Sequence, residues 1–438
     1  MTITQHILQE IGPYLTQQTT VWVGYSGGLD STVLLHALAS ISDTRFPLQA
    51  IHVNHQLSPA SNHWQAHCEQ TANALGVEIV CRRVEVRAAG AGLEHAAREA
   101  RYAEFESVVK EQDILLCGHH ADDQAETLMF RLVRGAGLRG LTAMNRSRAL
   151  GRGAIVRPLL AIPRVQLESY AQQNDLRWVE DESNQNPQFD RNFLRHQVMP
   201  LIQSRWPGSN TRMQQTAQWL SEADALLAEY ARADLDLCDV QSARLGQSLA
   251  LEVLEGFRFE RRKHVVRQWV AQCGFSAPDN KHLDQLERLI RSGVDSEAQL
   301  AWGQCEVRRF RQRLYLFSRL DPSLPAGEIR WKGDRPLKLP DGSVLSLEEG
   351  VPAASGFTIM FRQGGERCHP VGRKHSQTLK KLFQEFNVEP WLRDRVPLVY
   401  ADGQIAAVGD VFSCINSASQ NSAQPSQAGW QFSWRYPD

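Results

Sequence analysis

The chain of 438 residues is longer than one ordinary domain, which predicts two or three domains with ample buried core. Its 42% hydrophobic and 22% charged residues are typical of a globular protein, and the absence of any long apolar run argues against a membrane-spanning one. The formal net charge of −1 is compatible with nucleic-acid binding only if basic residues gather on one face.

The first residues, MTITQHILQEIGPYL, lack the basic segment and apolar stretch of a signal peptide, so we expect a cytoplasmic protein. Eight cysteines are scattered along the chain, and none form a Cys-x-x-Cys pair. Neither a zinc ribbon nor a redox pair is therefore predicted.

The first 205 residues alternate between strand and helix patterns, which predicts a parallel sheet covered by helices. The structure expected for residues 1–205 is thus a Rossmann-like α/β domain. Residues 154–160 could add an edge strand, and helices are expected at 163–174 and 189–202. The main strands are expected at 20–25, 48–53, 77–84 and 113–117, and the helices between them at 31–40, 60–75, 93–111 and 122–134.

The sequence RWPGSN at residues 205–210 interrupts this alternation. Residues 211–320 have apolar residues mainly at helical spacing, which predicts a largely helical middle domain ending in one strand at 308–317. After a linker, residues 328–438 predict a small α+β domain with a helix at 376–386 and a low-complexity loop at 417–429.

The stretch SGGLDS joins the first predicted strand to the first predicted helix. Two glycines let the backbone approach an anion, and a helix N-terminus presents unpaired N–H groups to it. No Gly-Lys-Ser/Thr closes the loop, so it is not a Walker A loop. Asp30 would repel a phosphate unless Mg²⁺ lay between them, although it could instead cap the helix.

Two later segments carry charged side chains on predicted helices. In GLEHAAREARYAEF, Arg98 and Arg101 share one face and could hold a phosphate or simply form a solvated face. In GHHADDQAETLMF, Asp123 and Glu126 are one helical turn apart and would suit a bound ammonium group. Acidic residues favoured in a helix's first turn are the alternative explanation.

The loop SGGLDS resembles the pyrophosphate-binding loop of the PP-loop ATP pyrophosphatases, which split ATP into AMP and pyrophosphate. Together with HVNHQL, the two helices above, RPLL and WVEDESN…FDRNFLRHQVMPLI, it is similar to the bacterial tRNA(Ile)-lysidine synthetase family. The C-terminal stretch LKKLFQEFNVEPWLRDRVPLVYADGQIAAVG also resembles that family. The resemblance implies ATP-dependent ligation of L-lysine to C2 of the wobble cytidine of tRNA(Ile) with anticodon CAU, through an adenylated cytidine.

The resemblance also implies roles for individual residues. ATP would lie against Ser26, Gly27, Gly28, Leu29, Asp30, Ser31 and Val53. Asp30 would hold Mg²⁺, and Asp123 and Glu126 would bind lysine, one of them accepting its proton. Arg98 or Arg101 would meet the α-phosphate or the flipped cytidine.

Basic residues provide candidate contacts to tRNA. Sequence-independent phosphate contacts are the natural use of a basic cluster, although single clusters are often only solvated surface. We expect no protein partner to be required. The candidate tRNA-binding residues are Asn192, Arg195, Arg373, Lys374, Lys380 and Lys381.

Two rival functions share the ATP chemistry. A tRNA thiolase usually needs a reactive cysteine pair, and this chain has no Cys-x-x-Cys. A small-molecule amidating ligase predicts a glutamine-hydrolysing cysteine domain, which has no visible signature.

Overall fold

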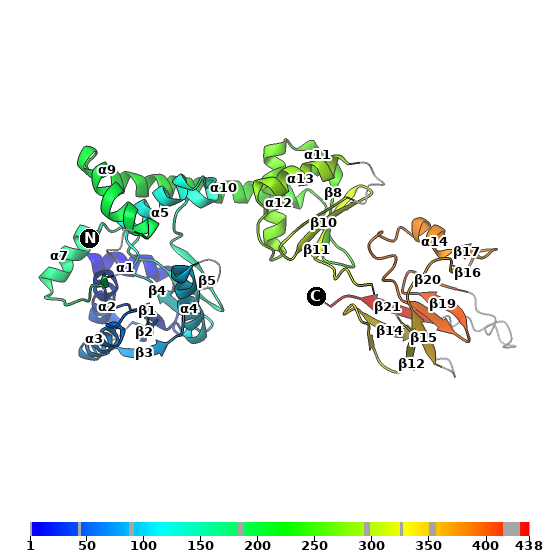
Figure 1. Ribbon diagram of the computed structural model, residues 1–438, viewed down its shortest axis with the longest axis horizontal. Helices are drawn as coiled ribbons and strands as arrows, with labels where there is room; N and C mark the ends of the chain where they lie inside the picture. The colour runs from blue at the N-terminus through cyan, green and yellow to red at the C-terminus, as the bar shows by residue number, and fades with distance from the viewer. Residues whose placement is uncertain are drawn as a thin grey trace. The chain divides into compact units, whose positions relative to one another are not determined.

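The computed structural model describes residues 2–42, 45–86, 92–182, 188–292, 298–324, 327–349, 356–414 and 430–437. The chain forms two compact units, Met1–Leu226 and Leu227–Asp438, and the boundary falls inside the long helix α10, Ser209–Asp236 (Figure 1). The predicted loop at 417–429 lies outside the described residues. The finer division into domains at 1–205, 211–320 and 328–438 remains a prediction.

The N-terminal unit is built on a six-stranded sheet in the order β3-β2-β1-β4-β6-β5. The pairs β1–β2, β2–β3, β1–β4 and β4–β6 are parallel, which confirms the predicted parallel sheet. The chain passes from β1 to β2 on one side and later places β4 on the other, so the strand order reverses beside β1. The strands are β1 Val21–Gly24, β2 Leu48–Asn54, β3 Glu78–Arg83, β4 Ile114–Leu116, β5 Ser147–Leu150 and β6 Gly153–Val156.

The two faces of this sheet are buried by different helices. Successive residues of a strand point to opposite faces, so Val21 and Val23 of β1 join one core while Trp22 joins the other. The first core is shared with α1, α2, α3 and α7, and the second with α4 (Figure 1). These helices are α1 Ile3–Ile11, α2 Leu29–Ser42, α3 Ser61–Ala74, α4 Leu93–Val108 and α7 Arg164–Gln173.

The remaining helices of this unit follow β4 and precede the second unit. Helix α5 begins directly after the β4 loop, and α8, η3 and α9 form one continuous helical stretch. These elements are α5 Ala121–Val133, α6 Leu138–Leu141, α8 Asp190–Phe193, η3 Leu194–Val198 and α9 Met199–Arg205, and a short 3₁₀ turn follows α1 at Gly12–Tyr14.

Two predictions for this unit need correction. The strand expected at the edge, β6, is internal because an unpredicted antiparallel strand, β5, pairs with it and takes the edge. The helix expected at 189–202 is present as the continuous stretch of α8, η3 and α9, but it contains the π-helical turn η3, which periodicity does not reveal.

The first part of the C-terminal unit contains the expected helices and also a five-stranded antiparallel sheet that the sequence did not predict. Helices α11 to α13 pack on this sheet, with Trp269 and Val265 of α12 fully buried. The sheet order is β7-β8-β11-β10-β9. The elements are β7 Gln241–Ser242, β8 Gln247–Ala250, α11 Leu251–Gly256, α12 Phe259–Gln272, α13 Asn280–Arg291, β9 Gln299–Trp302, β10 Cys305–Phe310 and β11 Arg313–Ser318.

The prediction of a single strand at 308–317 is wrong, because these residues belong to the hairpin of β10 and β11. Arg311 lies in the turn with a φ of +54°. Glycine or asparagine is usual in this conformation and would have indicated the turn in the sequence. Arg308 and Arg309 therefore lie on β10, Arg311 on the turn and Arg313 on β11.

The last part of the C-terminal unit is α+β, as predicted. Short antiparallel strands and α14 surround a core that includes Trp434, Phe383 and Ile359. The helix expected at 376–386 is present as α14, Leu379–Glu385. The strands are β12 Ile329–Trp331, β13 Leu337–Lys338, β14 Val344–Glu349, β15 Phe357–Met360, β16 Arg367–Cys368, β17 Gln377–Thr378, β18 Leu398–Ala401, β19 Gln404–Val408, β20 Phe412–Ser413 and β21 Gln431–Arg435.

Candidate active site

A cavity of about 1030 Å³ opens at the carboxyl ends of β1, β2 and β4. This is where ligands bind in open α/β sheets whose strand order reverses. Its walls bring together segments that are far apart in the sequence, including the 26–31 turn, the start of α5 and the stretch of α8, η3 and α9.

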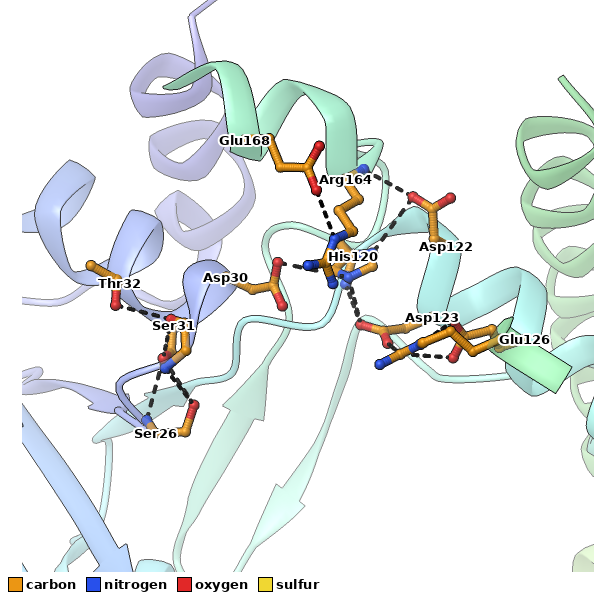
Figure 2. A network of polar contacts seen from close by, with 12 residues as sticks. Ser26, Asp30, Ser31, Thr32, His120, Asp122, Asp123, Glu126, Arg164 and Glu168 are labelled. Atoms are coloured by element: carbon orange, nitrogen blue, oxygen red, sulfur yellow. Dashed lines mark hydrogen bonds and ion pairs between the residues drawn. The ribbon is translucent and has the colours of Figure 1, made fainter. Parts of the chain in front are cut away.

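The turn between β1 and α2 is held by its own hydroxyl groups. The Oγ atoms of Ser26 and Ser31 lie 3.0 Å apart, and Ser31 Oγ donates to the Gly28 carbonyl at 3.1 Å (Figure 2). Gly27 has a φ of +83°, and a β-carbon there would lie 2.9 Å from Cys68 Sγ. The glycine is thus required by both conformation and space, and the turn exposes the N-terminus of α2 to the cavity.

Gly118 allows the loop after β4 to approach this turn closely. A β-carbon at Gly118 would lie 3.0 Å from the backbone nitrogen of Ser31 and from the carbonyl carbon of Asp30. No local pattern in the sequence indicates this requirement, because the contact joins segments nearly ninety positions apart.

His120 links Asp30 to the acidic residues of α5. Its ring is buried, with Nε2 at 3.7 Å from Asp30 Oδ1 and 3.4 Å from Asp123 Oδ2 (Figure 2). The His120 backbone N–H also donates to Asp123 Oδ2 at 3.0 Å. This histidine therefore fixes the spacing between the helix N-terminus and the carboxylates of α5.

Asp30 carries a buried carboxylate oxygen, Oδ1, that has no hydrogen-bond partner within the described residues. Burial raises the pKa of Asp30 above its ordinary value, and the nearby Asp123 charge adds to this while His120 opposes it. A buried carboxylate oxygen without a hydrogen bond is costly, and the His120 ring at 3.7 Å is too far away to donate one. The site would gain from a cation at this oxygen.

Asp123 and Glu126 project from the first turns of α5 and are both paired with one arginine. Arg195 Nε donates to Glu126 Oε1 at 2.6 Å, and its Nη2 donates to Asp123 Oδ1 at 2.8 Å. Arg191 lies farther away, at 3.4 Å from each carboxylate. The Glu126 side chain is only 6% exposed, so this pair of carboxylates holds the Arg195 guanidinium largely out of water.

The opposite charges of Asp123, Glu126 and Arg195 favour the ionised form of Asp123 and of Arg195. Burial acts to raise the pKa of Asp123, but the cationic groups around it, led by His120 and Arg191, outweigh burial and lower that pKa to about 2. Burial also acts to lower the pKa of Arg195, yet its hydrogen bond to Glu126 and the neighbouring carboxylates raise it above the ordinary value. Burial, together with the charges of Arg157, Arg191 and Arg101 and against that of Asp123, lowers the pKa of His119 to about 3, so that ring is neutral at pH 7.

Asp122, the third acid of this segment, has a structural role. Its carboxylate accepts the backbone N–H of Arg164 at 2.9 Å and the side-chain amide of Asn210. It thereby ties the start of α5 to α7 and α10.

The predicted site residues divide into three groups. Ser26, Gly28, Leu29, Asp30, Ser31, Val53, Arg101, Asp123, Glu126, Asn192 and Arg195 line the cavity, and Gly27 shapes the turn beside them. Arg98 is exposed and lies over the Tyr102 ring instead. Arg373, Lys374, Lys380 and Lys381 are exposed in the C-terminal unit.

Sequence reasoning missed Arg191 and His120 as members of the cluster. A signal for Arg191 existed, because it precedes Arg195 by one helical turn and so shares its face. His120 was noted only as preceding the acids, and its burial among three carboxylates follows from the tertiary structure.

The described residues lack two features. No group of three or more His, Cys, Asp and Glu side chains there has the arrangement of a metal site. Among the same residues, no helix is long and apolar enough to span a membrane.

Comparison with known proteins adds a family assignment. Residues 1–202 match the family model described as a PP-loop domain, residues 249–315 the TilS substrate binding domain, and residues 357–434 the TilS substrate C-terminal domain.

Relatives of similar length carry one name. The chain is 40% identical over 409 residues to the tRNA(Ile)-lysidine synthase of Coxiella burnetii, covering 90% of each chain. It is 41% identical to that of Legionella pneumophila strain Paris, covering 92% of this chain and 94% of the relative. It is 39% identical to that of Pseudomonas aeruginosa, covering 99% and 97%.

A solved structure of a U34-tRNA thiolase, NcsA from Methanococcus maripaludis, is a distant neighbour. It has a TM-score of 0.42 and 18% identity, covering 50% of this chain and 78% of that one. A likeness of this size carries no argument about function.

Proposed function

Because the chain belongs to the tRNA(Ile)-lysidine synthase family, we propose that the cavity at the carboxyl ends of β1, β2 and β4 is where lysine is joined to the wobble cytidine. The protein is a PP-loop ligase that uses ATP, and its substrate is a tRNA. Lysine as the second substrate, Mg²⁺ as the cation and the roles of individual residues belong to the proposal, as does a cytoplasmic location.

The reaction needs two chemical steps. The C2 oxygen of cytidine attacks the α-phosphorus of ATP, and pyrophosphate leaves. The ε-amino nitrogen of lysine then bonds to C2 while the C2–O bond breaks, and AMP leaves with the oxygen. The first step converts a poor leaving group into a good one, which is the purpose of spending ATP.

The start of α2 suits the phosphates of ATP. The helix N-terminus supplies N–H donors and partial positive charge, and Gly27 and Gly28 remove side chains from the approach. Val53 lines the cavity at the end of β2, where the nucleoside would lie. Arg101 lines the same cavity and is placed to meet phosphate or the target base.

Asp30 fits a magnesium ion. Its buried Oδ1 atom has no hydrogen-bond partner in the described residues, and Mg²⁺ is commonly held by one or two carboxylates plus phosphate oxygens rather than by a cage of protein ligands. When bound, the ion would neutralise charge on the phosphates.

The observation that carries the lysine assignment is the buried pair of carboxylates, Asp123 and Glu126, already holding a cationic side chain. An ammonium group carries the same charge as the Arg195 guanidinium, so lysine would take over these contacts as Arg195 withdraws. Only a neutral amine is nucleophilic. Asp123 also accepts the His120 backbone N–H, whereas Glu126 directs both of its oxygens to Arg195, which lysine would replace, so we assign the role of proton acceptor to Glu126.

The four basic residues of the C-terminal unit, Arg373, Lys374, Lys380 and Lys381, would contact tRNA phosphates. All four are exposed, and Arg373 and Lys381 are partly neutralised by Glu385, at 3.2 and 4.0 Å. Phosphates of a bound tRNA would compete for the same cations.

The direct test is incorporation of radiolabelled lysine into a tRNA(Ile) transcript bearing CAU, with ATP present. We expect incorporation with release of AMP, and its loss in Asp30→Ala. Formation of ADP, or no consumption of ATP in the presence of tRNA and lysine, would show the proposal to be wrong.

A further inference from the structure

Three arginines gather around one tyrosine beside the cavity. Arg98, Arg101 and Tyr102 lie on one face of α4, at positions i, i+3 and i+4. Arg148 comes from the edge strand β5, where it pairs with Ile155 of β6. Paired residues point to the same face of a sheet, and Ile155 packs in the core that α4 covers, so the register turns Arg148 towards α4.

The geometry of this Tyr102 cluster (Arg98, Arg101, Tyr102, Arg148) is close. The Cζ atoms of Arg98, Arg101 and Arg148 lie 4.8, 5.9 and 4.6 Å from the Tyr102 ring centroid. Arg98 Nη2 also donates to the Tyr102 hydroxyl at 3.3 Å. Phe105 holds the ring from behind in an edge-on contact, with centroids 5.8 Å apart.

The three guanidinium groups have no carboxylate partner within the described part of the chain. Glu104, on the same helix, pairs with Arg82 at 3.7 Å. By contrast Arg146, two residues before Arg148, is neutralised by Glu10 at 2.9 Å. Unpaired like charges around one ring repel one another, and an anion between them would relieve that repulsion.

The cluster extends outward from the cavity. Arg101 and Tyr102 belong to the cavity wall, whereas Arg98 and Arg148 are exposed and do not. A nucleotide whose base entered the cavity would leave its neighbouring phosphates near such a rim. Guanidinium groups bind phosphate in a bidentate manner and pack flat on aromatic rings, so the cluster presents preoriented donors.

We propose that the Tyr102 cluster, with Arg148 as its member from β5, binds a phosphodiester of the single-stranded RNA next to the nucleotide in the cavity. The inference rests on the proposed function, because it takes the cavity to receive a base of tRNA. It adds an RNA contact at Arg148, on the edge strand β5, which the sequence pattern did not predict.

The test measures the dissociation constant of the full-length protein for the tRNA(Ile) transcript between 50 and 200 mM salt, without ATP or lysine. We expect Arg148→Ala to weaken binding about tenfold at the low-salt end and to reduce the salt slope by about 1. The matched control is Arg152→Ala, which removes an exposed arginine from the adjoining β5–β6 turn and should leave both quantities unchanged. Arg148→Lys should recover most of the slope, because it keeps the charge.

Equal salt slopes for Arg148→Ala and Arg152→Ala would overturn the inference. So would an increased KM for ATP in Arg148→Ala with unchanged RNA binding, since the anion would then be a phosphate of ATP. Thermal unfolding of each variant checks that the fold is intact. If the wild-type protein binds tRNA in this manner but incorporates no lysine, the proposed function fails while the RNA contact stands.

Discussion

The guanidinium group of Arg195 lies 2.6 Å from a carboxylate oxygen of Glu126, although the two residues are 69 positions apart in the chain. The two carboxylates proposed to bind lysine, Asp123 and Glu126, are therefore already ion-paired with Arg195. Removing one partner of such a pair is costly, because the other charge stays buried. A ligand cation must compete with Arg195 for this site.

Replacing Arg195 by alanine should strengthen lysine binding in the absence of tRNA. The substitution frees both carboxylates of their nearest cation, and we expect L-lysine to bind about tenfold more tightly, a change of about 1.4 kcal/mol. Isothermal titration calorimetry measures this directly. Arg205→Ala, which removes an exposed arginine from α9, is the control and should bind lysine as the wild type does.

The same variant should be less stable until lysine is added. Two buried carboxylates left without Arg195 lower the free energy of unfolding, and a cation that binds only the native state restores it. Lysine should thus raise the Tm of Arg195→Ala more than that of the wild type. Unchanged lysine affinity together with equal Tm shifts would contradict competition at this site.

Glu126→Gln should raise the KM for lysine at least tenfold and change the KM for ATP by less than about twofold. The substitution removes one of the two charges that hold the ammonium group and, by our assignment, the proton acceptor, so kcat should also fall. Steady-state kinetics with each substrate varied in turn gives both constants. Glu168→Gln removes a carboxylate that pairs with Arg164 outside the lysine site, and it should leave the lysine KM unaltered. Equal increases in both KM values for Glu126→Gln would remove its assigned role.

Asp30→Asn should stabilise the fold at neutral pH. Burial raises the pKa of Asp30 in the native state, so the native state binds this proton more tightly than the unfolded chain does. The contribution of Asp30 to stability is therefore present at low pH and is lost as pH rises from the ordinary pKa through the raised one. Urea unfolding at several pH values, with EDTA present to exclude divalent cations, should show a smaller decline for the asparagine variant. A variant less stable than the wild type at pH 7 would contradict this sign.

Gly118→Ala should weaken ATP binding through the backbone. The new β-carbon would lie 3.0 Å from the backbone of Asp30 and Ser31, so the start of α2 must shift. We expect the KM for ATP to rise severalfold and Tm to fall. Gly12→Ala is the control, since Gly12 has helical φ and ψ and no atom within 4 Å of the new carbon. An unchanged ATP KM in Gly118→Ala would mean that this close approach does not shape the phosphate site.

Lys380→Ala/Lys381→Ala should weaken tRNA binding and reduce its salt dependence. Each lost phosphate contact lowers the salt slope by about 1. Binding of the tRNA transcript across a salt series measures it. Lys332→Ala/Lys338→Ala removes two exposed lysines elsewhere in the same unit and should have a smaller effect. Equal slopes for both double variants would identify Lys380 and Lys381 as ordinary surface residues.

The first unit was predictable because its signals are local. Alternating apolar strands and amphipathic helices predicted β1 to β4 and α2 to α5, and SGGLDS was correctly expected at a strand-to-helix turn, whose role as an anion site stays a prediction. The sheet of the second unit was missed for the opposite reason. Its strands are short, and the β10–β11 turn uses Arg311 at positive φ where no glycine marks it.

The sequence by itself determined the fold class of the first unit and the identity of the acidic residues on α5, because both follow from spacing along a few turns of chain. Only the tertiary structure decided that Arg195 holds those acids, that His120 connects them to Asp30, and that Arg148 reaches Tyr102. Each of these contacts joins segments brought together by sheet register or by packing of distant helices. Such long-range geometry leaves no periodic signal in the residues that make it.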